Sequence, residues 1–346
     1  MGETKLLTFR PEGIYCAVGD FFIDPWRPVP RALITHGHAD HARPGMGRYL
    51  CTDIAAPVMR HRLGEVDVET VAYGEERDIN GVSVSFHPAG HVPGSAQIRI
   101  AHRGEIWVVS GDYKVTPDGL STPFEPVRCH HFITESTFGL PVFRWQPQSD
   151  VAQDLNAWWR DCAEAGKIAM LGAYSLGKAQ RLMTMLDDVG PILTHGAVEA
   201  TNEVMRAQGI RLPDTQRVTP DTKGKDHPGA LVIAPPSALN AAWAKRFGAR
   251  ETGFASGWMA LRGIRRRRAG DRGFVISDHA DWPGLLDAIT ATEAENIYVT
   301  HGYTDIFTRY LNDSGWNAQV VATEFGDIED DTTETGVQER GEGAAA

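Results

Sequence analysis

One short segment places three histidines and an aspartate within six positions: His36, His38, Asp40 and His41. It directly follows an apolar run at residues 31–34 that is typical of a strand. Histidines at alternate positions of an extended chain can point the same way, while the aspartate and the third histidine can reach a neighbouring ion. Clustered histidines are costly to bury unless a metal or a charge pairs with them, so ligation of two metal ions is favoured over a polar surface loop.

Three further candidate ligands follow apolar or alternating runs that predict strands. The runs lie at residues 82–85, 106–110 and 297–300, and the ligands are His91, Asp112 and His301. Loops at one edge of a rigid sheet are common places for functional sites, because the sheet fixes the geometry and the loops supply the chemistry. A single histidine at a strand end is more often structural, but the ordered set indicates one site.

This order of residues resembles the metallo-β-lactamase fold, a four-layer αββα sandwich that holds two metals at one edge of its sheets. The resemblance covers residues 5–325 and implies two Zn²⁺ ions, with Mn²⁺ as the alternative metal. The implied ligands are His36, His38 and His91 for one ion, Asp40, His41 and His301 for the other, and Asp112 as the bridge. Because two dications outweigh two carboxylates, the centre stays positive and suits a phosphodiester, which gains negative charge as it reacts.

Two later segments resemble the signatures of the β-CASP branch of this fold, whose members are nucleases. Glu135 follows a predicted strand at residues 132–134, and His279 follows another at residues 274–277. The resemblance implies that Glu135 orients His279, which protonates the leaving 3′-oxygen, and that Asp40 orients or deprotonates the attacking water. An imidazole held by a carboxylate suits this acid role, although a purely structural pair is the alternative. Asp281 can simply cap the predicted helix at residues 282–289.

The fold predicted from the resemblance is α/β, with an α/β β-CASP domain inserted into the αββα sandwich. The predicted boundaries are 1–140 and 273–326 for the metallo-β-lactamase domain, 141–272 for the insert and 327–346 for an acidic, disordered tail. Within the insert, helix-like spacing at residues 150–165, 177–186, 198–208 and 237–247 alternates with strand-like runs at 167–172, 191–194 and 230–234. Such alternation is typical of a parallel sheet covered on both faces.

Several residues of the insert are candidates for nucleic-acid contacts. Ser175 and Lys178 lie at a strand-to-helix turn that suits phosphate, although an ordinary connection is the alternative. Trp258 can stack on bases or lie in the core. A basic run at residues 262–268 includes Arg265, Arg266 and Arg267, and either grips the phosphate backbone or is a solvated loop. His195 precedes a glycine as His301 does, but its place in the insert favours a structural or phosphate-binding role.

The global composition fits this interpretation. Residues 327–346 hold seven acidic residues and one arginine, so they carry more than half of the net charge of −11, which otherwise is unusual for a nucleic-acid enzyme. The four cysteines are scattered without a CxxC pair, which predicts neither a disulfide framework nor a zinc ribbon. The sequence shows no signal-peptide pattern and no apolar run near 18 residues, so we expect a cytoplasmic protein outside the membrane.

The favoured function is a binuclear zinc phosphodiesterase that resembles the bacterial ligase-associated DNA exonucleases and acts in DNA repair. The resemblance implies nucleic acid, a DNA ligase and a helicase as partners. An RNA-processing β-CASP ribonuclease is the main alternative, because that group also keeps a histidine at the His301 position. A glyoxalase-like thioesterase is disfavoured by the insert with Glu135 and His279. A non-catalytic nucleic-acid-binding subunit is disfavoured because no ligand is missing.

Overall fold

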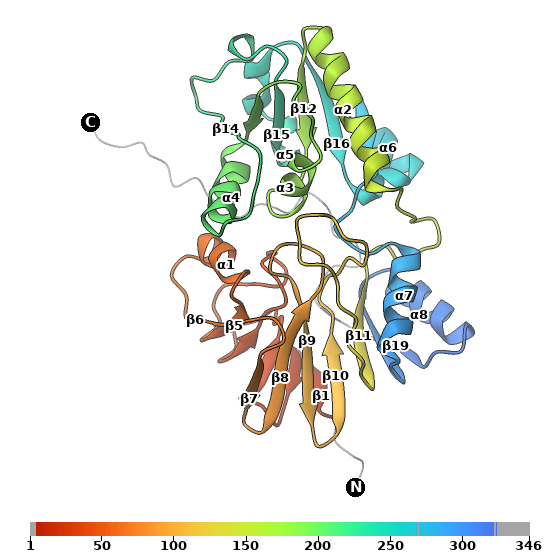
Figure 1. The fold of residues 1–346 in the computed structure, drawn as a ribbon. Coiled ribbons are helices and arrows are strands. Elements are labelled where there is room, and N and C mark those ends of the chain that lie inside the picture. Colours follow the sequence, from red (N-terminus) through yellow and green to blue (C-terminus); the bar gives the residue numbers. More distant parts are fainter. Residues whose placement is uncertain (1–4, 269, 322, 324–346) are drawn as a thin grey trace.

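The computed structural model describes residues 5–268, 270–321 and 323. The predicted acidic tail, residues 327–346, lies outside the described residues. Three sheets organise the rest of the chain, two of them stacked in the lower part of Figure 1 and the third in the upper part.

The first sheet has six strands in the order β1-β2-β3-β4-β5-β6, and β3 to β6 run parallel to one another. These strands are β1 (Leu7–Arg10), β2 (Gly13–Cys16), β3 (Phe21–Ile23), β4 (Ala32–Leu33), β5 (Tyr49–Thr52) and β6 (Val68–Val71). Helix α1 (Ala56–Leu63) covers its outer face, where Met59 packs in one cluster with Ala32 and Tyr49.

The second sheet has seven strands in the order β19-β18-β11-β10-β9-β8-β7. These are β7 (Glu76–Ile79), β8 (Val82–Pro88), β9 (Ala96–His102), β10 (Glu105–Val109), β11 (His131–Ser136), β18 (Asn296–Gly302) and β19 (Ala318–Val320). Helices α7 (Trp282–Thr292) and α8 (Thr304–Asp313) cover its outer face, with Leu285 and Phe307 packed on Phe132 and Val299. Strands β10, β11 and β18 are parallel, so their carboxyl ends meet at one edge.

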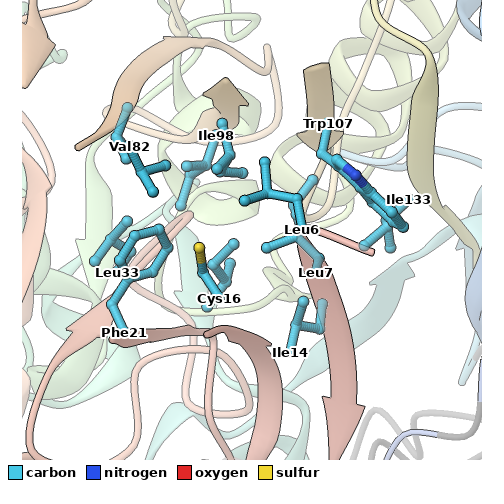
Figure 2. Packing of buried hydrophobic residues seen from close by; sticks show 14 of the residues in the cluster. Leu6, Leu7, Ile14, Cys16, Phe21, Leu33, Val82, Ile98, Trp107 and Ile133 are labelled. Atoms are coloured by element: carbon cyan, nitrogen blue, oxygen red, sulfur yellow. The ribbon is translucent and has the colours of Figure 1, made fainter. Parts of the chain in front are cut away.

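The core of the sandwich lies between these two sheets (Figure 2). Leu33 and Phe21 of the first sheet face Val82 and Ile98 of the second, and all four are fully buried. Alternating apolar residues on each strand supply this core, as the period of two predicts. Helix, sheet, sheet and helix therefore form the predicted four-layer αββα arrangement.

The third sheet has the order β14-β13-β15-β12-β16-β17, and all of its pairings are parallel. Its strands are β12 (Ile168–Gly172), β13 (Ile192–Thr194), β14 (Gln216–Arg217), β15 (Leu231–Ala234), β16 (Arg250–Ala255) and β17 (Arg272–Phe274). The helices around it are α2 (Gln148–Glu164), α3 (Lys178–Met183), α4 (Gly196–Ala207), α5 (Pro236–Leu239) and α6 (Arg262–Arg268), with 3₁₀ turns η1 (Gly224–Asp226), η2 (Ala242–Phe247) and η3 (Gly257–Ala260). Both faces of β12 are covered, because Leu171 packs with α2 and Met170 packs with Phe247. We refer to this part as the insert; the predicted boundary at 272/273 falls inside β17, and the boundaries remain a prediction.

Two predicted elements were wrong in extent. The helix predicted at residues 237–247 is interrupted, since α5 ends at Leu239 and Ala241 is extended before η2 begins. Asn240 is a weak helix former, and the apolar side chains on either side of it can still reach the sheet. The strand predicted at residues 274–277 ends at Phe274, beyond which the chain turns toward the metal-ligand candidates.

Candidate metal centre

The edge where the two stacked sheets open toward the insert collects all the predicted ligands. Strand β4 leads into the segment with His36, His38, Asp40 and His41, and β10 leads to Asp112. Three potential ligand groups form among the described residues, and in each the ligand atoms lie within 4.8 Å of one another. Two of them contain the predicted metal ligands: one is His36, His38, His91 and Asp112, and the other is Asp40, His41 and His301. The third is Asp112, Glu135 and His279.

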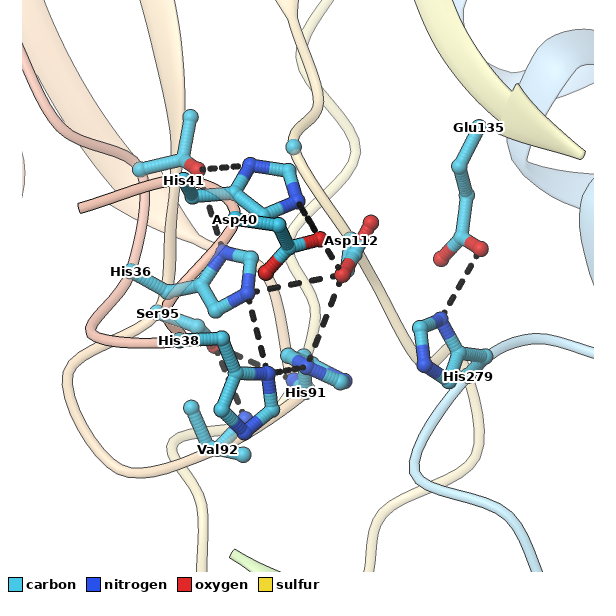
Figure 3. Close-up of polar contacts among 12 residues, drawn as sticks. His36, His38, Asp40, His41, His91, Val92, Ser95, Asp112, Glu135 and His279 are labelled. Carbon is cyan, nitrogen blue, oxygen red and sulfur yellow. Dashed lines mark hydrogen bonds and ion pairs between the residues drawn. The ribbon is translucent and has the colours of Figure 1, made fainter. Parts of the chain in front are cut away.

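Three imidazole nitrogens of the first group converge (Figure 3). His38 Nδ1 lies 3.2 Å from His36 Nε2 and 3.1 Å from His91 Nε2. Nitrogens bound at 2.0–2.1 Å to a tetrahedral zinc would lie about 3.3 Å from one another. The spacing of these three side chains therefore fits a metal ion of this size.

Asp112 lies between the two groups. Its Oδ2 atom is 3.4 Å from His36 Nε2 and 3.4 Å from His41 Nε2, while its buried Oδ1 atom has no hydrogen-bond partner among the described residues. An unpartnered buried carboxylate oxygen is costly unless a cation satisfies it. The preceding Gly111 has a φ of +55°, and a Cβ there would lie 2.5 Å from Thr35 Oγ1, so glycine allows this close approach.

The outward-facing nitrogens of four histidines each have a partner in the protein. Two of these partners are side chains: His36 Nδ1 lies 3.1 Å from Thr35 Oγ1, and His41 Nδ1 donates to Asp24 Oδ2 at 2.8 Å. The other two are main-chain carbonyls: His91 Nδ1 donates to that of Asp278 at 2.9 Å, and His38 Nε2 donates to that of Leu176 at 3.2 Å. Such bonds fix the ring orientation and direct the other nitrogen of each ring toward a metal. Their pattern assigns Nε2 of His36, His41 and His91, and Nδ1 of His38, to the inner side.

The electrostatics of the site fit metal ligands. Burial lowers the pKa of His36 to about 4, and burial together with the nearby His279 holds the pKa of His91 well below its usual value. Burial opposes ionisation of Asp112, but His41 and His279 still hold its pKa well below the usual range. At neutral pH His36 and His91 therefore offer unprotonated imidazoles beside a carboxylate, which is the state that a cation needs.

Glu135 and His279 form a pair next to the candidate metal ligands (Figure 3). His279 Nδ1 donates to Glu135 Oε2 at 2.9 Å, and the ring of His279 lies 4.6 Å from that of His91 between centroids. Glu135 is buried, and its Oε1 atom accepts from the Tyr113 amide at 2.7 Å. The predicted pairing is thus present, within 4.8 Å of an oxygen of Asp112.

Asp24 is a residue of the site that the sequence motifs did not predict. It follows β3 and is buried, and its carboxylate accepts from Thr35 N at 2.8 Å and Thr35 Oγ1 at 2.6 Å besides holding His41. Its φ is +41°, a strained conformation for a residue other than glycine, and His301 shares this feature with a φ of +56°. A carboxylate directly after an apolar strand is the sequence signal, the same one that identified Asp112.

The predicted nucleic-acid contacts are partly contradicted. Trp258 is only 6% exposed and packs against Phe138 and Phe143, so it is a core residue and not a stacking platform. Lys178 is also buried, with Nζ 4.0 Å from Asp278 Oδ2 and 4.5 Å from the centre of the Tyr174 ring, so it pairs with a carboxylate and does not stand ready for phosphate.

The remaining predicted residues are more varied. Ser175 is buried in the loop before α3, and its carbonyl accepts from Gln180. Arg265, Arg266 and Arg267 are exposed on α6, which is a helix and not a loop. His195 caps α4 by accepting from the Ala197 amide and packs on Trp243, which is a structural role. Asp281 caps α7 as expected, accepting from the Gly284 amide at 3.0 Å.

No helix among the described residues is long and apolar enough to cross a membrane.

No family model matches the chain. Curated relatives do match, and the chain spans only about a quarter to a third of the length of three of them.

A probable DNA ligase from Opitutus terrae is 28% identical over 331 residues, which cover 94% of this chain and 31% of that protein. RNase aCSPSF2 from Saccharolobus solfataricus is 28% identical, over 39% of this chain and 28% of that protein. Cleavage and polyadenylation specificity factor 73 from Drosophila melanogaster is 28% identical, over 47% of this chain and 26% of that protein.

Among solved structures, a protein of unknown function from Enterococcus faecalis shares the fold, with a TM-score of 0.57 and 12% identity over 86% of this chain and 80% of that one. Together with the ligand groups around Asp112, these similarities confirm that the chain resembles the β-CASP branch of the metallo-β-lactamase fold.

Proposed function

We propose that this protein is a binuclear, zinc-dependent phosphodiesterase that hydrolyses nucleic acid, with a DNA exonuclease acting in repair as the favoured form. The observation that carries the proposal is the position of Asp112, whose Oδ2 atom lies 3.4 Å from Nε2 of His36 in one ligand group and 3.4 Å from Nε2 of His41 in the other, with the Glu135–His279 pair directly beside it. Paired metals flanked by a proton donor suit displacement at phosphorus. Manganese is the alternative metal.

The residues of the site have different roles in the proposed reaction. Metal ions held by the two groups would activate water and stabilise the oxygen that leaves phosphorus. Asp40 is 23% exposed, with Oδ2 3.4 Å from His41 Nε2, so its carboxylate can orient or deprotonate the attacking water. Glu135 holds Nδ1 of His279, so Nε2 is the nitrogen that would carry the proton for the leaving oxygen.

The relatives support both the DNA and the RNA alternatives. One is named a probable DNA ligase and matches nearly the whole chain, which supports a ligase as a partner and DNA as substrate. Another is named an RNase, which supports the ribonuclease alternative. A helicase partner and a cytoplasmic location rest on the resemblance alone. The complete ligand set supports catalysis over a purely binding role.

Digestion of matched DNA and RNA oligonucleotides separates these alternatives. With single strands labelled at either end and Zn²⁺ or Mn²⁺ added, we expect stepwise shortening of DNA from one end, and no shortening with His38→Ala. Cleavage of RNA alone would replace the DNA proposal by the ribonuclease. Binding of either strand without cleavage would favour the non-catalytic subunit.

The arginines of α6 provide a second prediction. Replacing Arg265, Arg266 and Arg267 by Ser should weaken the binding of single-stranded DNA most at low salt. The reason is that binding with fewer phosphate contacts releases fewer counterions from the DNA. The slope of log K against log salt should fall by about 2 if all three contact phosphates. A salt titration of affinity measures this, with Arg128→Ser and Arg309→Ser as exposed controls far from α6 in sequence. An unchanged slope would contradict the proposed contacts between these arginines and the phosphate backbone.

A further inference from the structure

Two of the metal-facing histidines are held by main-chain carbonyls that belong to segments far away in the sequence. His38 donates to the carbonyl of Leu176, and His91 donates to the carbonyl of Asp278. Every residue type carries a carbonyl, so the position of this group depends on whatever fixes the segment that carries it. Both segments are hydrogen-bonded by neighbouring residues of one short helix, α3.

Gln180 of α3 fixes the Leu176 segment. It is fully buried, its Oε1 atom accepts from the Gly177 amide at 2.8 Å, and its Nε2 atom donates to the Ser175 carbonyl at 2.9 Å. The same Nε2 donates to Asn202 Oδ1 at 2.8 Å, which ties the amide to α4. One side chain therefore holds the main chain on both sides of Leu176.

Arg181, the next residue, fixes the Asp278 segment. It is 5% exposed, and its Nη1 atom donates to the Ser277 carbonyl and to Asp278 Oδ1, the latter at 3.1 Å. Its Nε atom donates to Gln148 Oε1 at 2.9 Å, so the guanidinium itself is held in place. Lys178 adds a second positive charge 4.0 Å from the Asp278 carboxylate.

The segment of Leu176 also contacts the metallo-β-lactamase part directly. The Leu176 side chain packs in one cluster with Val58 of α1 and Met205 of α4, and its Cδ2 atom lies 3.6 Å from where a Cβ at Gly37 would be. This apolar contact lies beside His38, so the position of the Leu176 carbonyl is set from the insert on one side and from α1 on the other.

We propose that Gln180 and Arg181 are positioning residues for the three-histidine metal group, acting through the Leu176 and Asp278 carbonyls on His38 and His91. The inference rests on the metal centre of the proposed function and adds that the insert helps to build that centre. Removing a partner of a metal-ligating histidine typically weakens metal binding 10–100-fold, that is, by about one to two powers of ten. In the group of Asp40, His41 and His301, His41 is oriented by the carboxylate of Asp24, so this group should be spared.

The test measures metal affinity one group at a time. In a His301→Ala background, competition of Zn²⁺ with a chelator should show about 10–100-fold weaker binding for Gln180→Leu and for Arg181→Met. In a His38→Ala background the same substitutions should leave the affinity unchanged. Visible absorption of bound Co²⁺ should report the altered geometry in the first background alone.

Asn156→Leu is the matched control for loss of a buried amide in the insert. Asn156 is 3% exposed and bonds the Met185 carbonyl and the Asp187 amide, but neither of these lies in the segments that hold His38 and His91. Equal losses in both backgrounds, or the same loss in Asn156→Leu, would overturn the proposal, because general destabilisation would then explain them. Arg181→Met, which tests the Asp278 carbonyl independently, decides the point if Gln180→Leu does not fold. Absence of metal binding in the unmodified protein would instead overturn the metal centre, and this role of α3 with it.

Discussion

Replacing Asp112 by Asn should reduce the rate of phosphodiester hydrolysis by at least about 10³-fold. The two side chains have the same shape, so the fold should persist, but the amide removes the negative charge that faces both ligand groups. It also turns a carboxylate oxygen within 3.4 Å of His36 and His41 into a potential N–H donor, which opposes a cation. Because Asp112 Oδ2 lies 3.4 Å from a histidine of each ligand group, both of the proposed metal ions should bind more weakly.

Two measurements check this prediction. Zinc content by atomic absorption should fall from the proposed two equivalents, and single-turnover hydrolysis of a labelled oligonucleotide should give the rate at saturating enzyme. Asp118→Asn is the control, since Asp118 is also buried and lies six residues away, but it accepts from the amides of Leu120 and Ser121 instead of facing the ligands. A variant at Asp112 with full zinc content and full activity would contradict the assignment of the bridge.

That the candidate ligands lie together could be predicted because they follow strand ends. Asp112, Glu135 and His301 lie on or after β10, β11 and β18, which are parallel neighbours, so residues distant in sequence come together at one edge. The first sheet adds its own ligands after β4. Apolar runs that are followed by a histidine or a carboxylate therefore indicated most of the candidate site.

What the sequence could not predict depends on the packing of distant segments. The Leu176 and Asp278 carbonyls carry no side-chain signal, and only the docking of the insert brings them to His38 and His91. Trp258 was misread because a glycine-flanked tryptophan suits a loop or a core equally, and the aromatic cluster that buries it comes from three separate segments. Such contacts are fixed by tertiary structure and leave no local pattern.

Replacing His279 by Asn should lower the rate of hydrolysis by about 10²–10⁴-fold, which is the usual contribution of a general acid. The expected loss is specific to the leaving group. In a substrate with sulfur in place of the bridging 3′-oxygen, the leaving thiolate does not need a proton. The variant should therefore lose much less activity on this substrate. The ratio of the two rates measures proton donation separately from metal binding and folding.

The control for this substitution is His131→Asn. His131 also faces a glutamate, with Nε2 3.5 Å from Glu105 Oε1, but it stacks on Trp107 away from the metal ligands. Glu135→Gln should lower the rate less than His279→Asn, because the amide oxygen can still accept from Nδ1 and orient the ring, although it no longer stabilises an imidazolium.

The sulfur substrate also decides between the two interpretations of the Glu135–His279 pair. If the pair is purely structural, His279→Asn should slow both substrates equally and lower the midpoint of thermal unfolding, as expected for a broken buried hydrogen bond. If His279 is the acid, the loss should fall on the oxygen leaving group alone. His279 is held by Glu135 on one side and lies against His91 on the other, so it is close enough to the metal ligands for a single phosphodiester to reach both. That proximity is why we expect the second result.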